Sequence, residues 1–171
     1  MVKCRQLSLL SALVSVFVFL CPATQAENSE VFNPDGYYFP KVKILVDGYV
    51  LEFFELETLD YYYDGALHYE RPRLKTPEAR VRLIKGKGGK FSDFRFTESV
   101  ITRERLFLRS EATPIGIITI EGGFLDKQGH FWERPEIKRF ETSVAQAVVT
   151  VVKAGKSVYT RQHDFTFWEG D

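Results

Sequence analysis

Short runs of alternating apolar and polar residues, separated by turn signals, make up most of the chain after residue 40. In residues 79–83, for example, three apolar residues alternate with Arg80 and Arg82. Alternation with a period of two places the apolar side chains on one face of a β-strand. No window of a dozen residues carries a convincing apolar stripe of 3.6-residue period. The sequence therefore predicts an all-β domain.

Two Asp-Gly pairs mark the expected hairpins. Asp47-Gly48 separates residues 41–46 from 49–56, and Asp64-Gly65 separates two short tyrosine-containing runs. Both residues of such a tight turn must accept a positive φ, which Asp and Gly tolerate well. Because Pro72 and Pro77 interrupt residues 71–78, we expect that segment to be a loop.

The pattern indicates nine or ten short strands, most of them joined by short connections. Strands are expected at residues 41–46, 49–56, 79–83, 91–96, 100–109, 115–121, 144–152 and 157–168, among others. Short connections favour antiparallel neighbours. We predict an antiparallel β-sandwich of about 8–10 short strands, with a small up-and-down, lipocalin-like β-barrel as the alternative.

The first 26 residues have the three parts of a secretory signal peptide. Lys3 and Arg5 precede an uncharged, largely apolar run over residues 7–21, and small residues at Thr24 and Ala26 precede the expected cleavage. The run is shorter than the ~20 apolar residues of a transmembrane helix. We therefore expect export with cleavage after Ala26.

Removal of residues 1–26 leaves a chain without sulfur. Cys4, Cys21 and Met1 all lie before the cleavage point, so the exported protein can form no disulfide. We expect residues 27–40 to be an extended, turn-rich segment and residues 41–171 to be a single all-β domain. The absence of both a disulfide and a glycosylation sequon favours the periplasm of a bacterium, with an extracellular location second.

The sequence lacks the patterns of common catalytic and metal sites. Cysteine chemistry is excluded after cleavage, and no serine-hydrolase elbow, P-loop or His-Glu-x-x-His motif is present. His68, His130 and His163 lie far apart and have no metal-ligand spacing. We predict no catalytic residue, no metal, no cofactor and no enzymatic activity.

Charge excludes two further classes of protein. Residues 27–171 carry 21 basic and 23 acidic residues, whereas a nucleic-acid binder usually has a large positive excess. A membrane-spanning barrel needs an apolar lipid face on every strand. The segment 100–109 instead places Arg103 and Arg105 on one face and Glu104 on the other. We therefore expect neither a nucleic-acid partner nor an integral membrane protein.

Opposite charges are segregated into adjacent blocks. Residues 44–70 hold seven acids and no base, and residues 71–95 hold nine bases and two acids. Cross-strand pairing between the blocks accounts for this pattern in structural terms. The functional interpretation is a polar surface that recognises another protein or an anionic envelope component. The candidate binding residues are Tyr61, Tyr62, Tyr63, Arg80, Arg82, Lys85, Lys87 and Lys90.

The resulting hypothesis is an exported cell-envelope protein that binds a partner through a charged, tyrosine-rich surface. Two alternatives remain. A barrel with an apolar interior cavity could carry a small molecule or lipid. A pair of carboxylates in a cleft could hydrolyse an envelope polysaccharide.

Overall fold

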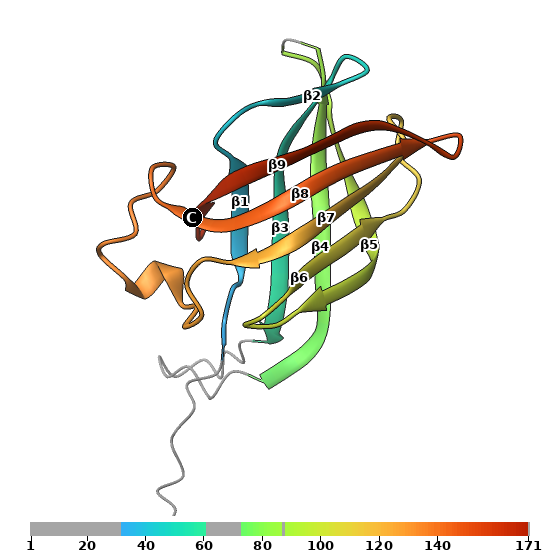
Figure 1. Cartoon of the computed structure of the whole chain (residues 1–171). Helices are drawn as coiled ribbons and strands as arrows, with labels where there is room; N and C mark the ends of the chain where they lie inside the picture. Colours follow the sequence, from blue (N-terminus) through green and yellow to red (C-terminus); the bar gives the residue numbers. More distant parts are fainter. Residues whose placement is uncertain (1–31, 61–72, 87, 171) are drawn as a thin grey trace, which may run out of the picture.

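The computed structural model describes residues 32–60, 73–86 and 88–170, and in this part of the chain nine antiparallel strands form one sheet (Figure 1). The elements are β1 (Gly36–Pro40), β2 (Ile44–Val46), β3 (Tyr49–Asp60), β4 (Arg73–Lys85), β5 (Phe91–Ile101), β6 (Leu106–Ser110), β7 (Ile117–Phe124), the 3₁₀ turn η1 (Phe131–Glu133), β8 (Ser143–Lys153) and β9 (Lys156–Trp168). The prediction of an all-β antiparallel domain is confirmed.

The sheet closes on itself as a barrel, which is the second of the two predicted architectures and replaces the β-sandwich. From β3 to β9 each strand pairs with the next one in the sequence. β1 then pairs with β9, from Tyr37↔Trp168 to Pro40↔Phe165, and with β3, from Gly36↔Leu56 to Tyr38↔Phe54. Because β1 is paired along both edges, eight strands form a closed ring, and β2 adds to β3 outside it.

The inner face of the barrel is packed with apolar side chains. On β8, Ala145, Ala147, Val149 and Val151 are buried, whereas Gln146 between them is exposed. Similar alternation marks β2, β6 and the first half of β7, so on these strands the period of two read from the sequence separates inside from outside. Each strand thus has an outer face that the core does not require.

Aromatic rings fill one end of the interior. Tyr38 stacks on Phe54 with ring centroids 4.8 Å apart, and Phe54 meets Phe165 at 5.0 Å. Phe131 from η1 enters the same cluster and contacts Phe167 at 5.2 Å. The segment that carries η1 therefore contributes to the core.

Two predicted boundaries are wrong. Residues 73–78 extend β4 and do not form a loop. The register between β4 and β3 shifts between Glu57↔Glu78 and Leu59↔Leu74, and Pro77 lies at this bulge. A residue in a bulge need not donate a ladder hydrogen bond, so proline is tolerated there. Residues 100–109 form two strands. The Thr102 hydroxyl accepts hydrogen bonds from the backbone N–H groups of Glu104 and Arg105, which turns the chain between β5 and β6.

The structure shows one of the two predicted Asp-Gly turns and an additional strand before residue 41. Asp47 and Gly48 adopt φ angles of 48° and 77° and join β2 to β3 as predicted. Asp64-Gly65 lies outside the described residues. Residues 36–40, which the sequence places in the N-terminal segment, form β1 and therefore belong to the barrel.

Candidate functional site

A row of apolar side chains crosses the outside of the barrel on four neighbouring strands. Leu45 pairs with Val50, Val50 with Ile84, and Ile84 with Phe91, so one line of cross-strand neighbours runs over β2, β3, β4 and β5. Phe91 is 62% exposed and Leu45 is 56% exposed. We call these four residues the outer apolar row. Val50 and Ile84 between them are half-buried, and apolar residues grouped in this way on a surface are typical of interaction sites.

Next to the outer apolar row, Arg82 lies between two aromatic rings. Its guanidinium carbon is 4.8 Å from the centre of the Phe53 ring and 4.3 Å from that of Phe91. The same guanidinium donates two hydrogen bonds to the Asp93 carboxylate, at 2.7 and 2.9 Å. Arg82 is therefore held in one geometry with its charge already balanced.

The aromatic surface continues from Phe53 toward β9. Tyr37 and Phe39 on β1 lie 5.1 and 5.3 Å from Phe53, and Phe39 also meets Phe140 at 5.0 Å. Trp168 lies 5.5 Å from Tyr37. Since alternate residues of β1 face outward, this cluster is separate from the aromatic core around Tyr38.

Below Phe53 the outer face becomes ionic. Glu55 is only 6% exposed and accepts hydrogen bonds from both Nε and Nη2 of Arg80, its direct neighbour on β4. Burial, followed by the neighbouring Glu55 carboxylate, raises the pKa of Tyr37. The predicted pairing between the acidic and basic blocks is therefore realised at Glu55 and Arg80.

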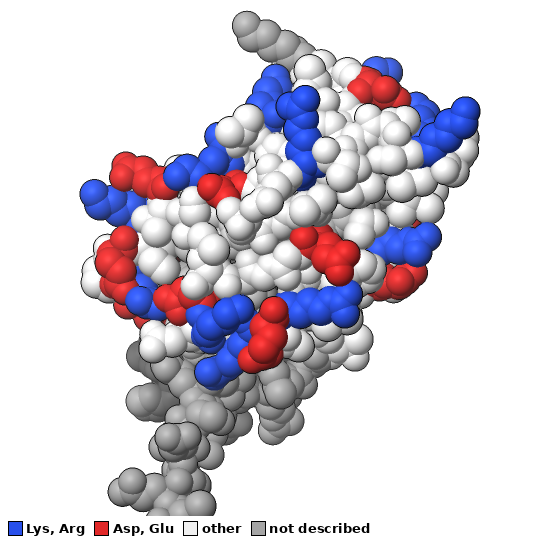
Figure 2. Space-filling model, in the orientation of Figure 1, with Lys and Arg blue, Asp and Glu red and all other residues white. Residues whose placement is uncertain are grey.

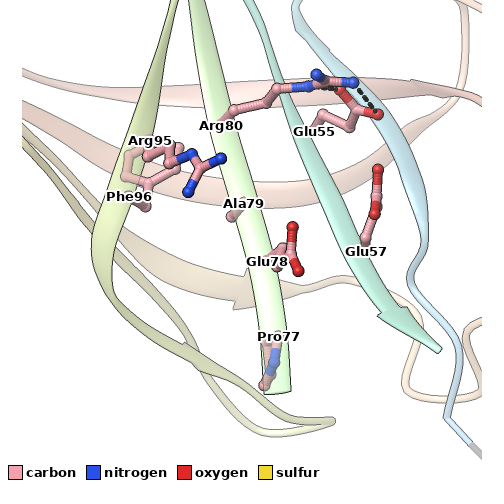
Figure 3. A pocket seen from close by; sticks show the side chains of 8 residues that line it. All are labelled: Glu55, Glu57, Pro77, Glu78, Ala79, Arg80, Arg95 and Phe96. Atoms are coloured by element: carbon pink, nitrogen blue, oxygen red, sulfur yellow. Dashed lines mark hydrogen bonds and ion pairs between the residues drawn. The ribbon is translucent and has the colours of Figure 1, made fainter. Parts of the chain in front are cut away.

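An open cleft of about 300 Å³ lies at the end of this ionic row (Figure 3). It forms because the ladder between β4 and β5 ends at Arg80↔Arg95. Its lining consists of Glu55, Glu57, Pro77, Glu78, Ala79, Arg80, Arg95 and Phe96. Ala79 and Phe96 are inward-facing, buried residues of the core that form the apolar part of the cleft lining.

The cleft brings two carboxylates together, as the hydrolase alternative requires. Glu57 and Glu78 are direct cross-strand neighbours on β3 and β4. Figure 3 shows both side chains rising side by side from one wall of the cleft. The acid and base of a glycosidase instead flank the scissile bond.

The structure brings together only some of the predicted site residues. Arg80 and Arg82 lie in adjacent outward positions of β4, each in an ion pair. Lys85 and Lys90 are exposed at the β4–β5 connection, where the Lys85 N–H donates to the Lys90 carbonyl. Tyr61, Tyr62, Tyr63 and Lys87 lie outside the described residues.

Several residues of this surface were not among the predicted site residues. Leu45, Phe53 and Phe91 are such residues, as are Glu78 and Arg95 in the cleft. Phe91 carries a recognisable signal, because it begins its strand beside the polar connection 85–90 and has the same parity as the charged residues Asp93 and Arg95. Apolar residues that share a face with charged ones are candidates for surface recognition.

His163 and Asp164 face opposite sides of β9, as their adjacency predicts. The buried His163 Nε2 is 2.6 Å from the Tyr159 hydroxyl, and burial lowers the pKa of His163. The exposed Asp164 accepts a hydrogen bond from Gln146. Within the described ranges, no group of three or more His, Cys, Asp and Glu residues could hold a metal ion.

The Arg82–Asp93 pair should make stability depend on pH. Hydrogen bonds from Arg82 lower the pKa of Asp93 below its ordinary value of 3.8. A lowered carboxyl pKa in the folded protein stabilises the fold above the unfolded-state pKa, and this contribution is lost as the pH falls through the folded-state pKa. We expect Asp93→Asn to flatten the fall in unfolding free energy below about pH 4, measured by urea denaturation from pH 7 to pH 2. If the unfolding free energies of wild type and Asp93→Asn fell in parallel as the pH was lowered, Asp93 would not be responsible for the pH dependence.

Searches of known proteins found no relative of this chain, because no family model, curated protein or solved structure matches it. The part of the chain that the structure describes has no helix with the length and apolar character needed to cross a membrane. Acidic and basic side chains are interspersed on the face shown in Figure 2, which carries no broad field of one sign.

Proposed function

We propose that this chain is an exported, non-catalytic protein that binds a protein partner through the outer face of β2–β5. The outer apolar row supports this proposal, because its four residues are not needed to fill the core. The rows beside it add an arginine between aromatic rings. Exposed aromatic and arginine side chains are enriched among the residues that dominate protein–protein binding energy.

The ion pairs that the two arginines already make favour a protein partner over an anionic envelope component. Arg80 and Arg82 are each paired with a carboxylate. An anionic ligand would have to compete with Glu55 and Asp93 for them. An apolar protein surface can cover Phe91 and Leu45 without breaking either pair, and it gains free energy from the buried apolar area.

The packing of the interior argues against the carrier alternative. Closely spaced rings occupy the barrel around Tyr38, Phe54 and Phe165. An eight-stranded barrel is just wide enough for its side chains to fill it or for one small ligand to be held. The filled aromatic end of the interior supports recognition on the outside.

A photo-cross-linking experiment tests the proposed surface. Benzoylphenylalanine would replace Phe91, and in a matched control it would replace Val148, which is 38% exposed on β8. We expect the protein with the probe at position 91 to form one discrete adduct in cells of its own organism. The purified partner should then bind Phe91→Ser roughly 30-fold more weakly than wild type, as expected for an interface hot spot.

Two outcomes would contradict the proposed function: identical adducts from positions 91 and 148, or equal affinity of wild type and Phe91→Ser for the partner. The same preparation tests export, because N-terminal sequencing of the cross-linked protein should start at Glu27. A protein that still begins at Met1 would argue against export.

A further inference from the structure

The cleft beside β4 is held open by the way β5 changes partner. At Arg95 the backbone N–H donates to the Glu111 side chain at 2.9 Å, and the Arg95 carbonyl accepts from the Glu111 N–H at 3.0 Å. Both backbone groups of Arg95 are therefore directed toward the β6 side. β5 then continues along β6, with Phe96 opposite Ser110. The gap between β4 and β5 thus begins where the β4–β5 ladder ends and the β5–β6 ladder begins.

Opposite charges face this gap from its two walls. Arg95 reaches from β5 toward β4, and the Glu78 carboxylate rises from β4 on the other side of Ala79 (Figure 3). Among the described residues, no ion pair within 4.0 Å includes Glu78 or the Arg95 guanidinium, although both line the same cleft. This contrasts with Arg80 and Arg82, which are both paired. The floor between the two charges is apolar and consists of Ala79 and Phe96.

From this arrangement we propose that the cleft binds a zwitterion of amino-acid size. The ammonium group of the ligand lies against Glu78, and its carboxylate accepts hydrogen bonds from Arg95. The methylene groups that join the two ends cover Ala79 and Phe96. A volume of about 300 Å³ is at the lower end of the range for small-molecule sites. This site lies on the same outer face as the outer apolar row but shares no residue with it, and its proposal does not depend on the proposed protein-binding function.

A titration with simple ω-amino acids tests the proposal without knowledge of the natural ligand. The probes are β-alanine, 4-aminobutanoate and 6-aminohexanoate, with hexylamine and hexanoate as singly charged controls. Binding is followed by the amide NMR signals of Ala79 and Phe96 in the purified protein. We expect at least one zwitterion to bind about two- to fivefold more tightly than either control, which is the gain from one additional exposed ion pair.

Two variants assign the two ends of the ligand. Glu78→Gln should reduce the affinity for hexylamine and for the zwitterion, and Arg95→Gln should reduce the affinity for hexanoate and for the zwitterion. Glu98→Gln, an exposed substitution on β5 outside the cleft, should leave all affinities unchanged. The proposal is overturned if no zwitterion exceeds the singly charged controls, or if both cleft variants bind like wild type. Cross-linking at Phe91 is a separate readout, so either proposal can fail alone.

Discussion

Phe54→Ala should lower the free energy of unfolding by about 3–5 kcal/mol, the usual range for truncation of a buried phenylalanine. The Phe54 side chain is fully buried, and its ring lies between Tyr38 and Phe165. Its removal leaves a cavity among rings that contact one another across three strands. For a chain of this size the thermal midpoint should fall by roughly 6–20 °C, which calorimetry or circular dichroism would measure.

A graded series separates loss of packing from general damage to β3. Phe54→Leu keeps much of the buried volume and should cost less than about 1.5 kcal/mol. Phe91→Ala removes the same atoms from a 62% exposed position, and its effect should stay within about 1 kcal/mol, the size of an exposed cation–π contact such as that with Arg82. If Phe54→Ala and Phe91→Ala lowered stability equally, the aromatic cluster would not be the core of the barrel.

Gly36→Ala should be the second severe change, with a loss of about 2–6 kcal/mol. Gly36 has a φ of 140°, and a Cβ built there would lie 2.5 Å from the Phe167 ring and 2.9 Å from the Trp168 carbonyl oxygen. The unfavourable backbone conformation accounts for about 1–3 kcal/mol, and overpacking accounts for a similar amount. Because β1 joins β9 to β3, hydrogen exchange at the β1–β9 amides should accelerate more than exchange at β6–β7.

Gly48→Ala is the matched control for Gly36→Ala. Gly48 also has a positive φ, of 77°, but nothing lies within 4 Å of a Cβ placed there. Its substitution should therefore show backbone strain alone, about 1–2 kcal/mol. Equal losses at the two glycines would mean that close packing against Phe167 and Trp168 does not restrict β1.

If both functional proposals hold, the protein has two separate sites on one side of its barrel. The outer apolar row crosses β4 at Ile84, near the end of the strand, whereas the cleft lies around Glu78, in the middle of the strand. Six residues of strand correspond to roughly 20 Å. A partner bound at Phe91 need not cover the cleft, so a small zwitterion and a protein could bind together.

The alternation of apolar and polar residues and the turn dipeptides predicted most of the strands, but they predicted the ends of the strands less reliably. Alternation predicted the buried and exposed faces of residues 79–83, and Asp47-Gly48 predicted the first hairpin, because both depend on a few adjacent residues. Pro77 argued for a loop, yet a bulge accommodates it in β4. Thr102 turns the chain through side-chain hydrogen bonds that alternation does not record.

The candidate site was predicted only in part, because the pairing and exposure of its side chains depend on the neighbouring strands. Segregated charge indicated contact between the two blocks, and Glu55 and Arg80 do pair. The same pattern gave Arg80 and Arg82 as binding residues without showing that each has a carboxylate partner. Leu45 and Phe91 read as ordinary strand residues, because their exposure depends on which face the neighbouring strands bury.

By itself, the sequence determined that the chain forms antiparallel strands, where one tight turn lies and which side chains of residues 79–83 face inward. Only the tertiary structure decided between sandwich and barrel, since closure depends on Tyr37 meeting Trp168 from distant parts of the chain. It also decided that β4 and β5 separate after Arg80 and Arg95, which creates the cleft. Strand periodicity is a local property of the backbone, whereas the edges that meet depend on twist, bulges and register summed over the whole sheet.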